Sequence, residues 1–374
     1  MKRSNSLALR IDVLDYARFL AAVGVVLFHY AQHGIEQGEI SSFTYIAGLN
    51  DFSRYGYLGV ELFFLISGFV IFLSSTGRTA TDFAIARLLR LYPAFIFCVL
   101  LTSSFCLMFG TPNFEITAPQ FFANLSMAPR WFHMDYVDGS YWTLILELSF
   151  YGMILLFIAL LGSEKLKYIF LFWPIWMIIS SALHASRLHS LTDPVTDFTH
   201  LGGYACYFVA GALFAMKKEQ SRWYIYPLIL ICLAYSIKQS AFQNMFVREI
   251  NPLSRTVIVC LIVAFYAFFE LLSSTRLSHW RLPIAAKLGA ATYPLYLIHQ
   301  TIGYIILTYF GTETNKLSLT LILIAVMSAA AYVIHLQIEV KMRPLWKYMI
   351  SNGIHRIVNF FGSRFAIKSR KIPA

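Results

Sequence analysis

The sequence predicts an all-α protein: a polytopic integral membrane bundle of about ten transmembrane helices with both termini in the cytoplasm. Of its 374 residues, 58% are hydrophobic and only 13% are charged, and the mean hydropathy is +0.63. About a quarter of the residues of an average soluble domain are charged. The apolar residues also fall into blocks of about 20, the length that a helix needs to cross a bilayer. So few charges cannot cover the surface of a water-soluble protein of this length.

Ten apolar blocks follow one another along the chain, and each is expected to form one membrane-spanning helix. Most are apolar on every face and run too long for buried strands. Pro174 and Pro227 interrupt two of them. The expected spans lie near 12–33, 55–75, 91–110, 140–162, 168–185, 200–216, 223–240, 256–274, 287–309 and 317–340.

The basic residues predict the orientation of these spans. With the N-terminus in the cytoplasm, the inner segments hold 22 of the 30 lysines and arginines. The positive-inside rule then places both termini in the cytoplasm. The net charge of +11 follows from this bias, and no basic helix or aromatic platform outside the spans indicates nucleic-acid binding.

The chain is expected to form one transmembrane domain over residues 1–345, followed by a basic cytoplasmic tail over 346–374. Because basic and apolar residues alternate in the tail, we expect it to lie on the lipids of the inner leaflet or to be partly disordered. The five cysteines all fall in apolar blocks without the spacing of metal ligands, so no metal site is expected.

Five ionisable residues stand out inside the expected spans: Arg18, His29, Glu61, Glu147 and His299. A charged side chain within a bilayer costs several kcal/mol by most estimates, so such residues usually face a polar interior or carry function. By their distance from the span ends, the two histidines and two glutamates fall in the outer half of the membrane and are expected to line one cavity.

Arg18 and His29 are expected on one face of the first helix. They are eleven residues apart, which is about three full turns and about 16 Å along the axis. Asp15, three residues before Arg18, can pair with it. The alternative is a salt-bridged helix contact without catalytic meaning.

An imidazole and a carboxylate at a shared depth suit general-base chemistry. The alternatives stay open at this point. His299 taken alone can be a packing residue, Glu61 can pair with Arg54, and a proton-coupled transporter would use the same set.

Arg87 and Arg90 form a second cluster, at the inner end of the third span. Their spacing of three residues places both on one side of a helix. Two guanidinium forks suit phosphate oxygens. The alternative is plain snorkelling to anionic lipid headgroups.

Motifs around these residues occur in order between about residues 10 and 340. They are Arg18 and His29 with ten residues between them, Gly59–Phe69, Arg87 with Arg90, Trp142–Tyr151, and Tyr293–His299. In these motifs the chain resembles membrane acyltransferase family 3, which includes O-acetyltransferases of bacterial surface polysaccharides.

Some positions depart from the family's pattern. Glu61 stands where Asp is usual, so its carboxylate has a different reach, and Tyr16 replaces a usual Gly. Thr143 replaces Ser and keeps the hydroxyl. Leu148 replaces a frequent second Glu, which leaves Glu147 alone in that role.

The resemblance implies an O-acyltransferase of the bacterial inner membrane with no bound cofactor. It would take an acyl group, acetyl by default, from cytoplasmic acyl-CoA to a hydroxyl of a cell-surface or exported saccharide, lipid-linked or not. Its implied site residues are His29, Arg18 and Glu147 for catalysis, Arg87 and Arg90 for acyl-CoA, and His299, Glu61, Ser67, Trp142 and Tyr296 for acceptor binding or support. Direct attack by the hydroxyl and transfer through an acyl-histidine both remain open, as does a transporter or flippase of a glycan intermediate.

Overall fold

The computed structural model describes residues 10–110, 114–184, 198–220, 222–244 and 255–369. These residues form helices joined by turns and loops, with no strand among them, so the all-α prediction is confirmed. Within these described ranges, eight helical stretches are long and apolar enough to cross a membrane, which makes this a multi-pass membrane protein. The stretches are Asp12–Glu36, Leu49–Ser75, Ala80–Phe109, Gly139–Leu161, Ser163–Leu183, Ile225–Gln243, Arg255–Ser274 and Lys316–Lys341.

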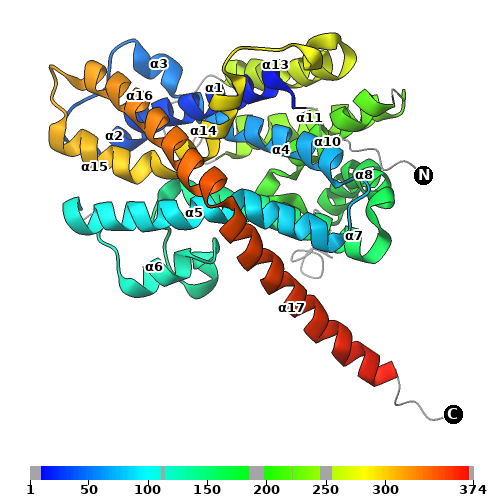
Figure 1. Cartoon of the computed structure of the whole chain (residues 1–374). Coiled ribbons are helices and arrows are strands. Elements are labelled where there is room, and N and C mark those ends of the chain that lie inside the picture. The colour runs from blue at the N-terminus through cyan, green and yellow to red at the C-terminus, as the bar shows by residue number, and fades with distance from the viewer. Residues whose placement is uncertain (1–9, 111–113, 185–197, 221, 245–254, 370–374) are drawn as a thin grey trace.

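The bundle is built from helices that run along a common axis (Figure 1). Its main helices are α1 (Asp12–Phe28), α4 (Gly59–Ser75), α5 (Ala80–Phe109), α7 (Trp142–Leu161), α8 (Leu166–His184), α10 (Ala205–Glu219), α11 (Ile225–Lys238), α13 (Arg255–Ser274), α14 (Ala285–Ile298), α15 (Gln300–Phe310), α16 (Lys316–Ile334) and α17 (Arg343–Ser369). Short helices α2 (Gly34–Glu36), α3 (Leu49–Ser53) and α6 (Ala118–Asn124) lie in the connections.

Helix α5 begins eleven residues before the expected span, at Ala80 rather than near residue 91. Thr79 caps its N-terminus, because the Thr79 Oγ1 accepts a hydrogen bond from the Asp82 backbone N–H at 3.1 Å. Pro93 lies inside the helix without ending it. Arg87 and Arg90 therefore lie on a continuous helix, as their spacing predicts.

The span expected near 287–309 is a helix interrupted at His299, where α14 ends and α15 begins. The His299 backbone carbonyl accepts hydrogen bonds from the Tyr30 hydroxyl (2.7 Å) and from the Gly303 N–H (3.0 Å). The expected span near 200–216 is α10, a helix of only 15 residues. The interrupted pair and α10 fall short of the length of a simple spanning helix, so the ten-span count stays a prediction.

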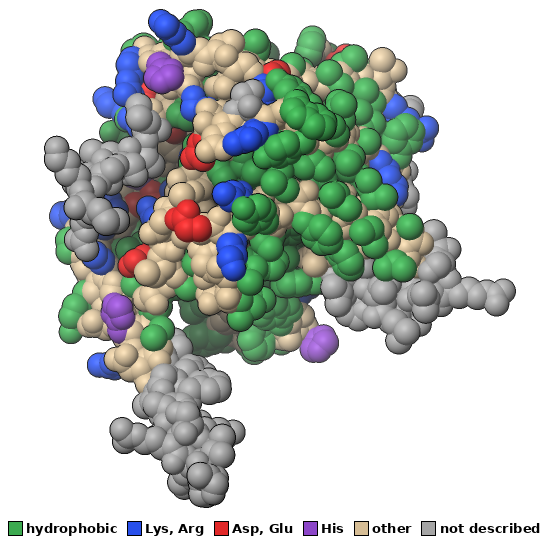
Figure 2. Space-filling view, turned by 90° about the vertical axis from the view of Figure 1, so that its right-hand side faces the viewer, with side chains coloured by type: hydrophobic (Ala, Val, Ile, Leu, Met, Phe, Trp, Pro, Cys, Tyr) green, Lys and Arg blue, Asp and Glu red, His purple; other side chains and the backbone are tan. Residues whose placement is uncertain are grey.

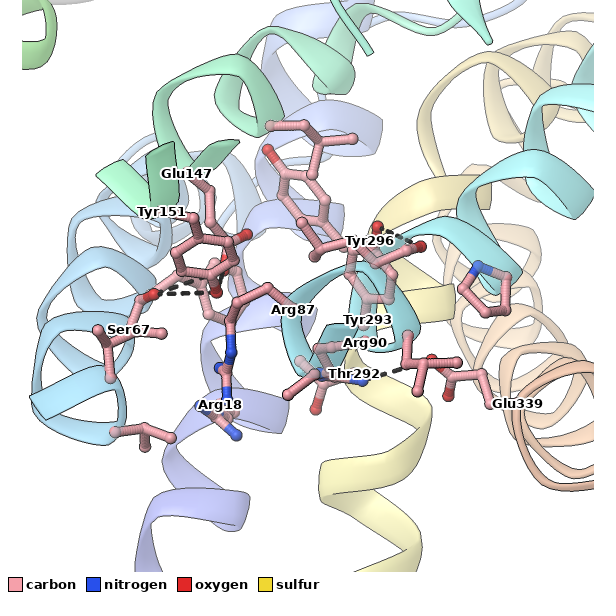
Figure 3. A pocket seen from close by; sticks show the side chains of 18 of the residues that line it. Arg18, Ser67, Arg87, Arg90, Glu147, Tyr151, Thr292, Tyr293, Tyr296 and Glu339 are labelled. Carbon is pink, nitrogen blue, oxygen red and sulfur yellow. Dashed lines mark hydrogen bonds and ion pairs between the residues drawn. The ribbon is translucent and has the colours of Figure 1, made fainter. Parts of the chain in front are cut away.

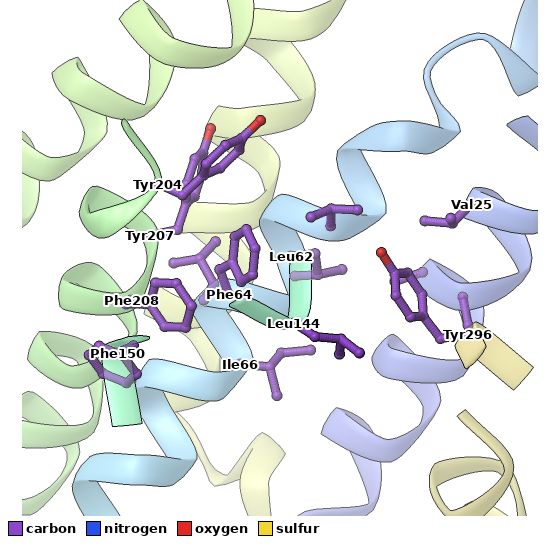
Figure 4. Close-up of a cluster of buried hydrophobic side chains, with 14 of the residues drawn as sticks. Val25, Leu62, Phe64, Ile66, Leu144, Phe150, Tyr204, Tyr207, Phe208 and Tyr296 are labelled. Atoms are coloured by element: carbon purple, nitrogen blue, oxygen red, sulfur yellow. The ribbon is translucent and has the colours of Figure 1, made fainter. Parts of the chain in front are cut away.

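Helix α10 lies at the centre of the bundle, buried over Ala205–Lys217 and in contact with α4, α8, α11 and α13. It approaches α4 closely because a methyl group added at Gly68 or Gly211 would overlap the backbone of the opposite helix. Aromatic rings fill the core beside this contact (Figure 4), and the ring of Phe208 lies 4.3 Å from that of Phe150 and 4.6 Å from that of Phe64, centroid to centroid.

Helix α16 passes through a π-helical segment, η10 (His335–Lys341), into α17. The first turns of α17 contact α5, and the rest of the helix projects from the bundle, red in Figure 1. The expected tail over 346–374 thus begins inside α17, and its residues 370–374 lie outside the described part. Figure 2 looks onto the end of the bundle near the N-terminus, where Lys and Arg side chains are numerous. The positive-inside rule predicts that this end faces the cytoplasm.

Candidate active site

A cavity of about 460 Å³ lies between α1, α4, α5, α7, α14 and the η10–α17 segment (Figure 3). Its polar lining includes several of the site residues predicted from sequence, together with others that were not expected. The polar and charged lining residues are Arg18, Ser67, Arg87, Arg90, Thr143, Glu147, Tyr151, Thr292, Tyr293, Tyr296, His335, Glu339, Arg343 and Trp346.

The two arginines of α5 face this cavity with aromatic rings beneath them. Arg87 donates from Nη2 to Ser74 Oγ (3.3 Å), and its guanidinium carbon lies 5.7 Å from the ring centroid of Tyr151. Arg90 lies 5.1 Å from the ring centroid of Tyr293. Cation–π contacts of this kind hold a guanidinium in place without consuming its hydrogen-bond donors.

Arg18 of α1 lines the same cavity, and Figure 3 shows it beside Arg87. Its expected partner Asp15 instead accepts a hydrogen bond from Arg10 Nε at 2.7 Å. Arg78, in the turn between α4 and α5, adds to the positive field. Partial burial, and then the nearby charge of Arg87, hold the pKa of Arg78 below its usual value. This end of the cavity therefore attracts anions.

Glu147 of α7 faces the arginines across the cavity and is hydrogen-bonded by two hydroxyl groups. Tyr151, four residues later on the same helix face, donates to its carboxylate. Ser67 of α4 donates to the Glu147 Oε1 at 3.4 Å. The structure thus brings together Glu147 and Ser67, two residues predicted from separate motifs.

His29 and His299 form a separate, buried cluster with His33 and Tyr304. The His29 ring centroid lies 5.0 Å from that of His299 and 5.4 Å from that of His33. The His29 Nδ1 lies 2.8 Å from the Tyr304 hydroxyl oxygen. His299 Nδ1 lies 2.7 Å from the backbone carbonyl of Tyr296. Because a carbonyl only accepts, this contact assigns the proton of a neutral His299 to Nδ1 and the lone pair to the buried Nε2.

Tyr296 lies between the cavity and the histidine cluster. Its side chain lines the cavity, and its ring centroid is 5.5 Å from that of His299. Its hydroxyl is 2.8 Å from the Thr143 Oγ1. His29 and His299 do not themselves line the cavity, so the expectation of one cavity shared by both histidines and both glutamates is not met.

Glu61 and Trp142 also lie outside this lining. The Glu61 Oε1 accepts hydrogen bonds from the Ser240 Oγ (3.1 Å) and from the Asn244 Nδ2 (3.5 Å), on the side of α11. Its Oε2 is buried without a partner in the described part of the chain. The Trp142 ring packs 5.7 Å from that of Tyr204, centroid to centroid.

Several residues of the site were missed from the sequence. Tyr151 carried a signal, since it follows Glu147 by four residues and so shares its helix face. His335 and Glu339 carried the same signal within an apolar block, and they form an ion-pair contact at 2.6 Å. Asp138 is fully buried and accepts from the Ser140 N–H (3.0 Å) and the Thr301 N–H (2.9 Å). It ties the start of α7 to α15, a contact that no local pattern reveals.

No group of three or more His, Cys, Asp or Glu side chains in the described ranges is arranged to hold a metal ion. A family model described as an acyltransferase domain matches residues 11–336. No curated protein and no solved structure matched the chain. The match covers most of the chain and includes every motif residue named above, from Arg18 to His299. The chain therefore belongs to the acyltransferase 3 family and is a membrane acyltransferase.

Proposed function

We propose that this protein of the bacterial inner membrane transfers an acetyl group from cytoplasmic acetyl-CoA to a hydroxyl of a cell-surface or exported saccharide. One observation carries the proposal: three arginines, Arg18, Arg87 and Arg90, line one cavity in a chain of an acyltransferase family. That cavity lies toward the end of the bundle for which the positive-inside rule predicts a cytoplasmic location.

The phosphates of acetyl-CoA bind Arg87 and Arg90 through charge-assisted hydrogen bonds. The Arg90 side chain is 40% exposed, so a water-soluble donor can reach it. The pantetheine arm then extends past Arg18 and Glu147 toward Tyr296, which are lining residues of the same cavity. Tyr296 lies between this cavity and His299, so the proposal requires its side chain to move before the thioester reaches the two histidines.

His29 acts as the general base in this scheme. With its Nδ1 proton donated to Tyr304, its Nε2 accepts the proton of the saccharide hydroxyl. The hydroxyl oxygen forms a bond to the thioester carbonyl carbon, the carbon–sulfur bond breaks, and the CoA thiolate takes the proton from the imidazolium. His299, 5.0 Å away ring to ring, orients His29 or the acceptor.

Transfer through an acyl-histidine is the other route for the same residues. In that route the Nε2 of His29 attacks the thioester carbonyl carbon, the carbon–sulfur bond breaks, and CoA leaves as a thiolate. The saccharide hydroxyl oxygen then bonds to the acetyl carbon, the carbon–nitrogen bond breaks, and the hydroxyl proton is released to water, which balances the proton that the thiolate takes up. The two routes differ in kinetics, because the acyl-histidine route is ping-pong.

The decisive experiment uses the purified full-length protein in lipid nanodiscs with radiolabelled acetyl-CoA and a panel of bacterial saccharides. We expect acceptor-dependent release of free CoA thiol and covalent label on the saccharide. A label that stays on CoA with every acceptor, together with passage of unmodified glycan across proteoliposomes, would support a transporter and sink the proposal. The mass change of surface glycan in a strain lacking the chain would then identify the acceptor.

A further inference from the structure

The C-terminal segment of the chain forms one wall of the arginine cavity. Glu339 of η10 and Arg343 and Trp346 of α17 line it, and Glu339 contacts Arg90 of α5. These three residues lie beyond residue 336, where the match to the family model ends. The inner turns of α17 contact α5, the helix that carries Arg87 and Arg90. This wall is therefore a part of the cavity that the family match does not cover.

Two side chains that line this cavity each carry a buried N–H group without an acceptor. The two groups are Nε–H of Arg87 and Nε1–H of Trp346, and neither has a hydrogen-bond partner among the residues that the structure describes. Leaving a buried donor unpaired costs free energy, so native proteins rarely keep one without a reason. Two such donors on one cavity indicate a ligand that brings acceptor oxygens.

The charges of the lining indicate an anionic ligand. Arg18, Arg87, Arg90 and Arg343 all line the cavity. Glu339, whose side chain is only 10% exposed, contacts Arg90 at 3.4 Å and thereby balances part of this positive charge. Phosphate oxygens supply both the negative charge and the acceptors that this wall lacks.

We infer that Trp346 and Arg343 complete the donor-binding site, with the Trp346 Nε1–H donating a hydrogen bond to a phosphate oxygen of acyl-CoA. This inference rests on the proposed function, because it takes acyl-CoA as the donor. The first turns of α17 then belong to the donor-binding site. The segment expected to be a separate cytoplasmic tail therefore begins within that site. The phosphates take the place of Glu339 on Arg90 when the donor binds.

Binding of CoA to the full-length protein, measured by titration calorimetry, tests the inference without relying on turnover. Trp346→Phe keeps an aromatic ring and removes the N–H, and it should weaken CoA binding about tenfold, the usual effect of losing a hydrogen bond to a charged group. The matched control is Trp223→Phe, since Trp223 is 82% exposed and is not part of the lining. Pantetheine, which has no phosphate, should bind the wild type and Trp346→Phe equally.

A second variant guards against misfolding of the first. Arg343→Gln should weaken CoA binding severalfold and reduce its salt dependence, whereas Arg222→Gln, at an exposed position outside the lining, should change neither. Wild-type affinity for CoA in both Trp346→Phe and Arg343→Gln would overturn the inference and leave the proposed function standing. If the wild type itself bound no CoA, the proposed function would fail, and the inference with it.

Discussion

The arginine cavity and the histidine cluster differ in open volume, charge and burial, although Tyr296 contacts both. The cavity is open space of about 460 Å³, lined by four arginines and two glutamates drawn from several helices. The cluster is closed: His299 is fully buried, His29 is 9% exposed, and their polar contacts are to a tyrosine hydroxyl and a backbone carbonyl. Under the proposed function, a charged, water-soluble donor binds in the first environment, whereas the second keeps water away from the histidines. Under the proposed function, donor binding and acyl transfer therefore involve two different regions, which meet at Tyr296.

The largest loss of acetyl transfer is expected from a substitution in the histidine cluster. His29→Ala should lower acetyl transfer about a thousandfold or more, because a positioned general base contributes roughly 10²–10⁴ in rate. CoA affinity should stay near that of the wild type, since His29 is outside the cavity lining. Turnover and calorimetry on the same preparation measure both quantities. Near-normal turnover would remove His29 from the mechanism.

The next largest effect is a loss of acetyl-CoA binding, which is expected from substitutions in the arginine cavity. Arg87→Ala combined with Arg90→Ala should weaken acetyl-CoA binding about 100-fold, because each hydrogen bond to a charged group contributes about 1.5–3 kcal/mol. The turnover number at saturating donor should fall much less. Lys165→Ala, at an exposed position outside the lining, is the control. An unchanged KM for acetyl-CoA in the double variant would mean that Arg87 and Arg90 bind lipid headgroups instead of the donor.

Tyr304→Phe sharpens the comparison because it removes only the hydroxyl that lies 2.8 Å from the His29 Nδ1. We expect turnover to fall about tenfold, as for the loss of one hydrogen bond of ordinary strength, with CoA affinity unchanged. Tyr309→Phe on the same helix, at a position 57% exposed, should have neither effect. Weaker CoA binding in Tyr304→Phe would show that the two regions are coupled.

The smallest expected effect is a gain in CoA affinity rather than a loss. Glu339→Gln removes a negative charge that contacts Arg90 at 3.4 Å, so CoA should bind about threefold more tightly at low salt. The gain should shrink as salt is added. Glu164→Gln, exposed and outside the lining, is the control. Weaker binding in Glu339→Gln would mean that this carboxylate instead positions Arg90 for the donor.

Composition and apolar block length were enough to predict an all-α membrane protein, and helices occupy the predicted spans. The prediction worked because the bilayer requires long apolar segments whatever their neighbours are. Helix ends were less predictable. Thr79 caps α5 well before its apolar part begins, and only the surrounding contacts explain the interruption at His299.

Pairings within the site were harder to predict than the residues themselves. Helical spacing places Tyr151 with Glu147 and Arg87 with Arg90, and both arrangements are present. Depth within the membrane suggested that His29, Glu61 and Glu147 meet, but depth does not say which way each helix is rotated. Glu61 faces Ser240, and Trp346 reaches the cavity from a segment that the sequence assigned to a tail. Such contacts join residues far apart along the chain, so they cannot be predicted from a single sequence.

The burial of α10 has a consequence for how the protein is made. This helix touches other helices on all sides and is only 15 residues long, so lipid cannot stabilise it in isolation. Two of its neighbours, α11 and α13, are synthesised after it. We therefore expect α10 to settle in the bundle late during biogenesis, once the helices that follow it have left the ribosome. In a chain whose synthesis is stopped before α13, we therefore expect α10 to lack its final helix contacts.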